Sequence, residues 1–199
     1  MTAVLLAACT ALIPLTPSRA RTAAREGTAM ADTMHGYAVK PWVIYQSADP
    51  LRAVHGRAGV DAIAVETPYE RVRFEAYLHR LQGERITAAR VRAFFEKARD
   101  RLGFLVYVHS RGQDDHSFLT QFHAPSLILP GGAAVVATTS SIFGPSGDFY
   151  DVGSFREERL IGSITYGFAL PACAGPMQLE LIDGYGDRYA VRFDLRSYR

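Results

Sequence analysis

The sequence predicts an α+β fold, a mainly antiparallel β-sheet or β-sandwich that carries a two-helix hairpin. Apolar and polar side chains alternate through the last third of the chain, from Leu160 to Leu195, which is the two-residue period of half-buried strands. Two capped amphipathic segments also follow each other in the middle, from Thr67 to Gly103. Helices that stand together, instead of alternating with strands, are typical of α+β proteins and not of parallel nucleotide-binding sheets.

The composition indicates one domain that needs no special stabilisation. The chain has 199 residues, of which 48% are hydrophobic, so it can bury a core without disulfides or a metal. Its formal net charge of +2 is too small for the basic surface of a nucleic-acid-binding domain. The sequence contains no Gly-rich phosphate loop, nucleophile elbow or paired-cysteine zinc pattern. We therefore expect no nucleic-acid partner and find no ready-made catalytic motif.

The N-terminal residues are typical of an export signal. From Ala3 to Leu15 the chain is almost entirely apolar, which matches the core of a signal peptide and falls short of the ~20 residues that span a membrane. Ser18 and Ala20 are small residues at the two positions that a signal peptidase reads. We therefore predict a signal peptide over residues 1–20, with cleavage near Ala20.

Two alternatives to cleavage near Ala20 stay open. Leu6-Ala7-Ala8-Cys9 resembles the lipobox of bacterial lipoproteins, in which the cysteine carries the lipid, so Cys9 is a lipidation candidate. Conversely, no Lys or Arg precedes Arg19, although signal peptides normally begin with basic residues, and the first residues could form a buried helix of a cytosolic protein. We favour export, and with it a periplasmic, secreted or outer-membrane-anchored location.

The segment after the signal predicts a connection rather than part of the fold. Residues 21–36 are rich in Ala, Thr and Arg and show no sustained apolar period, which is typical of a flexible linker. The folded domain is therefore expected to span residues 37–199. Its first two strands are predicted at Trp42–Tyr45 and Ala62–Val65, short apolar runs near turn-forming residues.

The first predicted helix begins at Thr67 and ends near Gly83. Thr67 suits the N-cap, Pro68 suits the first helical position, and Glu70 is placed to return a capping-box hydrogen bond. The apolar stripe of this helix has the spacing i, i+3, i+4 and i+7 and consists of Phe74, Tyr77, Leu78 and Leu81.

A second helix is predicted from the N-cap Thr87 to Gly103, which suits a left-handed helix end. Its apolar stripe consists of Val91, Phe94, Phe95, Ala98 and Leu102. Helices this short are stable mainly through tertiary packing. We therefore expect both stripes to lie against the β-sheet as part of one core.

The remaining strands follow from alternation and turn signals. A strand is predicted at Phe104–His109, and a turn at Gly144–Asp148. One hairpin is predicted around Pro130–Gly132, between strands at Leu127–Leu129 and Ala133–Ile142. A second is predicted around Asp183–Asp187, between strands at Met177–Leu181 and Tyr189–Leu195.

One segment concentrates side chains that could bind a ligand. It begins at the end of a predicted strand and contains His109, Asp114, Asp115, His116 and His123. Imidazole and carboxylate groups are ligands of zinc and other transition metals. The spacing of these residues matches no known metal motif, so we favour a polar surface loop between strands and keep its side chains as binding candidates.

The sequence favours an exported, non-enzymatic binding or envelope-associated module that acts through its sheet or its loops. Its expected partner is another protein or a cell-envelope component, with no cofactor and with membrane contact only through a lipid on Cys9. The alternative is a small hydrolase in which zinc, held by residues of the His109–His123 segment, activates water and an aspartate acts as base.

Overall fold

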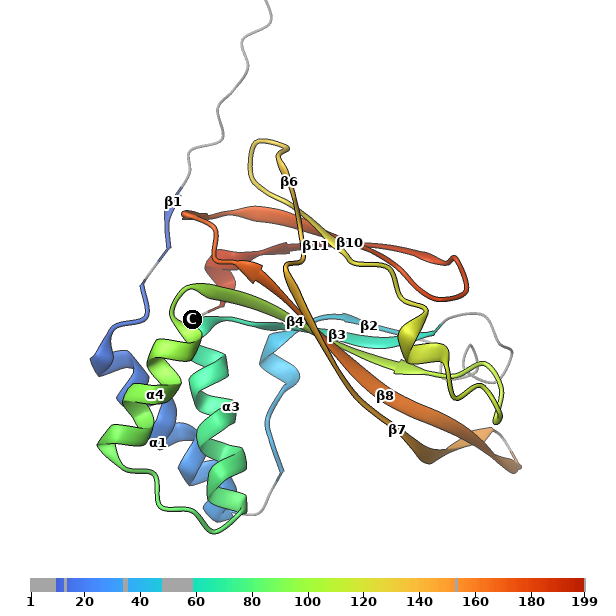
Figure 1. The fold of residues 1–199 in the computed structure, drawn as a ribbon, viewed down its shortest axis with the longest axis horizontal. Helices are drawn as coiled ribbons and strands as arrows, with labels where there is room; N and C mark the ends of the chain where they lie inside the picture. The colour runs from blue at the N-terminus through green and yellow to red at the C-terminus, as the bar shows by residue number, and fades with distance from the viewer. Residues whose placement is uncertain (1–9, 13, 34–35, 48–58, 153, 199) are drawn as a thin grey trace, which may run out of the picture.

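The computed structural model describes residues 10–12, 14–33, 36–47, 59–152 and 154–198. The described residues form three α-helices, namely α1 (Pro17–Thr33), α3 (Pro68–Leu81) and α4 (Ala88–Ala98). They also form a five-stranded and a four-stranded antiparallel sheet. The predicted α+β class with antiparallel sheets is confirmed (Figure 1).

The larger sheet has the strand order β2-β3-β4-β8-β7. The bounds are β2 (Val43–Gln46), β3 (Val60–Glu66), β4 (Arg101–His109), β7 (Thr139–Val152) and β8 (Phe155–Ala169). The long hairpin of β7 and β8 projects beyond the other strands (Figure 1), and β7 forms one edge of the sheet.

The smaller sheet has the order β11-β10-β5-β6, and the two-residue strands β1 and β9 pair separately. Its strands are β5 (Ser126–Ile128), β6 (Ala134–Val136), β10 (Pro176–Ile182) and β11 (Arg188–Asp194), and the short pair is β1 (Thr10–Ala11) with β9 (Cys173–Ala174). Three single-turn 3-10 helices are η1 (Lys40–Trp42), η2 (Phe118–Thr120) and η3 (Leu195–Ser197).

The main core lies between the two sheets, as the alternation of the last third predicts. Ile164, Tyr166 and Phe168 of β8 share this core with the alternate residues of β10 and β11. Phe104 of β4 meets both Phe168 and Phe193 edge-on, with ring centroids 5.5 Å apart in each pair. The Phe104–Phe193 contact crosses from the larger to the smaller sheet, so an aromatic pair contributes to the packing of the two layers.

The helices do not pack as the sequence predicts, because they form a core of their own. Val91, Phe94 and Ala98 of α4 are buried with Val72 and Ala76 of α3 against the small residues of α1. Figure 1 shows the three helices side by side, next to the sheets. The expectation that the stripes cover the sheet is wrong for α4, because α1 and α3 take the place that the sheet was expected to fill. In the predicted α3 stripe, Leu78 and Leu81 are exposed, whereas Phe74 lines a small cavity with residues of β3 and β4.

The predicted linker over residues 21–36 is wrong, since most of it belongs to α1 (Pro17–Thr33). The buried face of α1 repeats at i, i+3, i+4, i+7 and i+11 and consists of Ala20, Ala23, Ala24, Gly27 and Ala31. Small side chains carry little apolar signal in the sequence. They nevertheless let helix backbones approach closely. Helix α1 is therefore held by close backbone packing rather than by the burial of large apolar side chains.

Two predicted processing sites have different positions relative to α1. Cys9 lies outside the described residues, whereas Ala20 lies within α1 with 0% of its surface exposed. Cleavage after Ala20 would remove the first turn of this helix. No helix in the described part of the chain is long and apolar enough to cross a membrane.

The caps of the second and third helices are confirmed, but other details differ. The Thr67 and Thr87 hydroxyls accept backbone N–H bonds from Glu70 and Arg90, each at 3.3 Å. Helix α4 ends at Ala98, before the predicted Gly103, because the chain has already entered β4. The predicted turn at residues 144–148 lies inside β7, where a register shift between positions 143 and 146 bends the strand.

Candidate functional site

The structure places the predicted binding residue His109 inside the end of the five-stranded sheet. The side chain is 2% exposed, and its Nδ1 lies 2.8 Å from Oδ1 of Asp61 on β3. The imidazole is thus paired with a neighbouring strand and not with the carboxylates that follow it in the sequence.

Asp115 comes together with an aromatic residue of the β10–β11 turn. The Tyr185 hydroxyl donates to Asp115 Oδ2 at 2.7 Å and accepts the backbone N–H of Arg111 at 2.9 Å. The Arg111 guanidinium lies 3.8 Å from the centre of the Tyr185 ring and donates to Asp187 Oδ2 at 2.8 Å. Burial, followed by the Asp115 carboxylate, raises the pKa of Tyr185 to about 12. These contacts fasten the predicted binding loop to the turn.

The other predicted residues, Asp114, His116 and His123, are exposed to solvent. Their recorded hydrogen bonds are made by the backbone: the His116 N–H donates to the Asp114 carbonyl and the His123 N–H to the Ile182 carbonyl. Within the described residues, no three His, Cys, Asp or Glu side chains gather where they could hold a metal ion. The five predicted residues are therefore not brought together around one point.

The predicted turn at Asp183–Asp187 is confirmed, and Asp183 is its anchor. Asp183 is 1% exposed. Its carboxylate accepts the backbone N–H groups of Tyr185 and Asp187, both at 2.9 Å, and the Tyr189 hydroxyl at 3.1 Å. A buried carboxylate with this many donors serves to hold the loop.

A buried ion pair joins α3 to the segment before the sheet. The Glu70 carboxylate accepts from Arg73 Nε at 2.7 Å and also from the Tyr37 hydroxyl. The Arg73 guanidinium lies over the rings of Tyr37 and Trp42, at 4.9 and 5.4 Å from their centres. Burial, with the Glu70 charge second, raises the pKa of Tyr37. The polar groups of Tyr37, Glu70 and Arg73 satisfy one another, so these three residues suit an anchoring role.

A groove along α1 is the strongest candidate for a binding site. We call it the arginine groove, a cavity of about 680 Å³ between α1, the end of α3 and the start of α4. It is lined by Ser18, Arg21, Ala24, Arg25, Thr28, Ala29, Asp32, Arg80, Arg85, Ile86, Thr87, Ala88 and Val91. Its volume lies in the range of ~300 to 1,000 Å³ that ligand sites usually have.

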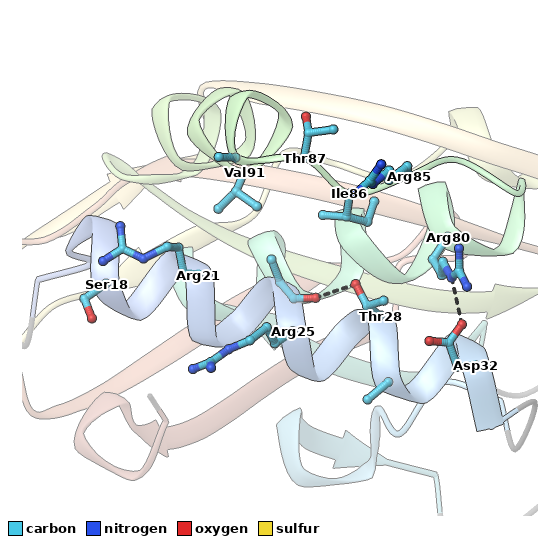
Figure 2. A pocket seen from close by; sticks show the side chains of 13 residues that line it. Ser18, Arg21, Arg25, Thr28, Asp32, Arg80, Arg85, Ile86, Thr87 and Val91 are labelled. Atoms are coloured by element: carbon cyan, nitrogen blue, oxygen red, sulfur yellow. Dashed lines mark hydrogen bonds and ion pairs between the residues drawn. The ribbon is translucent and has the colours of Figure 1, made fainter.

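The floor of the arginine groove is apolar and shallow. Figure 2 shows Ile86 and Val91 directed toward α1. The α1 residues that line the groove recur at helical spacing from Ser18 to Asp32, a distance of about 21 Å at 1.5 Å per residue. The arginine groove is therefore long, and its lining contains small alanines.

Positive charge surrounds this floor. Arg80 is paired with Asp32 at 2.7 Å and closes one end (Figure 2), and Arg25 donates to the Thr22 hydroxyl at 3.3 Å. Within the described part of the chain, neither Arg21 nor Arg85 has a carboxylate partner. The first turn of α1 also contains no acidic residue, so the positive end of its dipole is not neutralised there.

The sequence interpretation missed the arginine groove. The arginines of residues 19–25 stand in the segment interpreted as a signal end and a linker, and Arg80 and Arg85 stand among acidic residues. A sequence signal for helix α1 does exist. Arg21 and Arg25 have the spacing i and i+4, beside alanines at positions 20, 23, 24 and 31. This pattern is typical of a helix with one small and one basic face.

Comparisons of this chain with protein-family models, curated proteins and solved structures match nothing.

Proposed function

We propose that this protein is a binding module, without catalytic chemistry of its own, that receives an acidic amphipathic helix of a partner protein in the arginine groove. The observation that carries this proposal is the pair Arg21 and Arg85, which have no carboxylate partner within the described residues and stand beside an apolar floor. Positive charge next to apolar surface suits a partner of opposite charge, since burial of the apolar surface favours binding and the complementary charges orient the partner and speed its association.

The shape supports a helix as the occupant. A helix that lays its apolar side into a groove between two others is a common recognition mode, and the lining residues of α1 follow one face for about four turns. Such a partner would cover Ile86, which is only partly buried, next to the already buried Val91, and would add a fourth helix to the helical layer. Its acidic residues would meet Arg21 and Arg85.

Export is part of the same proposal. Processing at Cys9 would leave α1 intact, whereas cleavage near Ala20 would remove the first turn of α1 and with it Ser18 of the groove. The pairing of β1 with β9, directly after Cys9, also favours a mature chain that keeps these residues. We therefore favour lipidation at Cys9 in an extracytoplasmic setting, with a protein of the cell envelope as the partner.

The test uses a synthetic helix as the probe. A labelled peptide of about 18 residues, with leucine and alanine on one face and glutamate on its flanks, is long enough to cover the groove. Its fluorescence anisotropy is measured with the full chain and with an R21Q/R85Q variant. We expect the variant to bind ~2- to 30-fold more weakly at low salt, as for two partly exposed ion pairs.

The matched control is an R92Q/R188Q variant, because both residues are exposed, lie outside the groove and remove the same charge. It should bind the peptide like the unaltered chain. Equal losses in both variants would indicate unspecific attraction and contradict the proposal. The last experiment uses vesicles that contain anionic phosphatidylglycerol. If R21Q/R85Q loses binding to the vesicles but keeps its binding to the peptide, the groove recognises lipid instead of a helix.

A further inference from the structure

A second cavity has a different chemistry. It lies beside η2 at the β7 edge of the large sheet, and we call it the η2 cleft; its volume is about 340 Å³. Ile164 and Tyr166 of β8, Leu119 of η2, and Ser140 and Ile142 of β7 contribute to its walls. The cleft thus lies over the paired part of β7 and β8, where Ser140 is the register partner of Tyr166 and Ile142 that of Ile164.

Tyr166 is the most informative residue of the η2 cleft. Its side chain is 4% exposed, and its hydroxyl makes no hydrogen bond within the described residues. Burial alone raises the pKa of Tyr166 to about 12, which agrees with a hydroxyl that meets neither a charge nor a polar partner. The hydroxyl oxygen itself is not fully enclosed by protein, so it reaches the cleft that Tyr166 lines. A ligand in the cleft can therefore supply the hydrogen-bond partner that tyrosine hydroxyls in protein interiors usually have.

The remaining lining excludes a charged ligand. None of the lining residues carries a charge, and the hydroxyls of Thr120, Thr138, Thr139 and Ser140 surround the apolar residues Leu119 and Ile164. Burying an ion in such surroundings without a countercharge is costly. An apolar body with a hydrogen-bonding group is the chemistry that this lining accommodates.

We propose that the η2 cleft is a binding site for a neutral, mainly apolar small molecule whose carbonyl or other acceptor oxygen accepts a hydrogen bond from the Tyr166 hydroxyl. This site is separate from the arginine groove in position and in chemistry, since one cavity is lined by four arginines and the other by no charged residue. The two proposals therefore stand or fall independently.

Three ligands of nearly equal shape test the proposal. They are 2-acetylnaphthalene, which has an acceptor, 2-ethylnaphthalene, which has none, and 2-naphthoate, which is charged. Each is titrated into the isotope-labelled full chain while backbone amide shifts are followed by NMR. We expect 2-acetylnaphthalene to bind most tightly and to shift amides of η2, β7 and β8. We expect Y166F to weaken its binding ~3- to 10-fold, the worth of one neutral hydrogen bond, and to leave 2-ethylnaphthalene unchanged.

A matched pair of β7 variants locates the site. Ser140 lines the η2 cleft, whereas Ser141, the next residue, does not and points to the opposite face by strand alternation. S140F should abolish binding of 2-acetylnaphthalene, and S141F should not. The proposal is overturned if none of the three compounds shifts these amides, if 2-naphthoate binds as well as the ketone, or if Y166F or S140F leaves the ketone's affinity unchanged.

Discussion

Gly27 of α1 lies directly against the backbone carbonyl of Arg73 in α3. A Cβ atom placed on Gly27 would stand 2.0 Å from that oxygen and 3.1 Å from the Tyr77 backbone nitrogen. Because the obstacle is backbone, no side-chain rotation can remove it. This contact fixes how closely α1 approaches α3, and therefore where the helical layer and the arginine groove lie.

The first prediction concerns this contact. G27A should destabilise the protein by about 1–3 kcal/mol, the usual cost of overpacking, although alanine favours a helix by about 1 kcal/mol over glycine. Urea unfolding measures the change. Gly112 is the control, since a Cβ there meets nothing within 4 Å, and G112A should be nearly neutral. A G27A protein as stable as the parent would contradict the packing of α1.

The second prediction separates two neighbouring rings of α4. Phe94 is 5% exposed and contacts the His79 ring at 5.2 Å between centroids, whereas Phe95 is only partly buried. F94A should cost about 3–5 kcal/mol in the free energy of unfolding, as for other buried phenylalanines, and F95A clearly less. Equal costs in thermal or urea unfolding would mean that the helix face is misassigned.

Large side chains made much of this fold predictable. The sheet core follows from the alternation of large side chains such as Tyr166, Phe168 and Phe193 with small or polar ones. The two helix starts follow from the capping residues Thr67 and Thr87. Helix α1 could not be predicted in the same way. Its packing depends on Gly27 meeting Arg73, a contact between residues far apart in the sequence that leaves no apolar period.

The sequence was also less informative about sites, because these too depend on contacts between residues that are far apart in the chain. The predicted cluster combined His109 with Asp115 because they are close in the chain, yet in the fold His109 contacts Asp61 and Asp115 contacts Tyr185. The arginine groove assembles residues from three helices. Neighbourhood in the sequence therefore says little about which polar groups converge.

The third prediction concerns pH. Burial raises the pKa of Glu66 above its ordinary value, against the opposing charge of Arg71. A carboxyl group whose pKa is higher in the folded than in the unfolded state stabilises the fold below the unfolded pKa, and this contribution is lost as the pH rises through the folded pKa. The stability of the parent relative to E66Q should therefore fall as the pH is raised from about 4, near the ordinary glutamate value.

Chemical denaturation of both proteins across this pH range measures the difference. E66Q keeps the side-chain shape next to Gly103, where space is tight, so packing changes little. D114N serves as the control for the loss of one carboxylate, because this side chain is exposed. A parent that becomes more stable relative to E66Q as the pH rises would contradict this prediction, because it would show that the fold favours ionised Glu66.

The last prediction concerns the β10–β11 turn. D183N keeps the size of the side chain but replaces one acceptor oxygen with an NH2 donor. In the variant this donor would face N–H or O–H groups that donate to the Asp183 carboxylate in the parent. Hydrogen bonds to a charged group are each worth about 1.5–3 kcal/mol, and we expect D183N to lower the free energy of unfolding by at least that of one bond.

Asp187 is the informative comparison for this prediction. Its carboxylate is half-exposed and accepts from Arg111, so D187N should cost less than 1 kcal/mol, as is usual for a surface ion pair. Faster amide hydrogen exchange at Tyr185 in D183N, and not in D187N, would show that the loss arises in the turn itself; unchanged exchange would mean that Asp183 does not hold it.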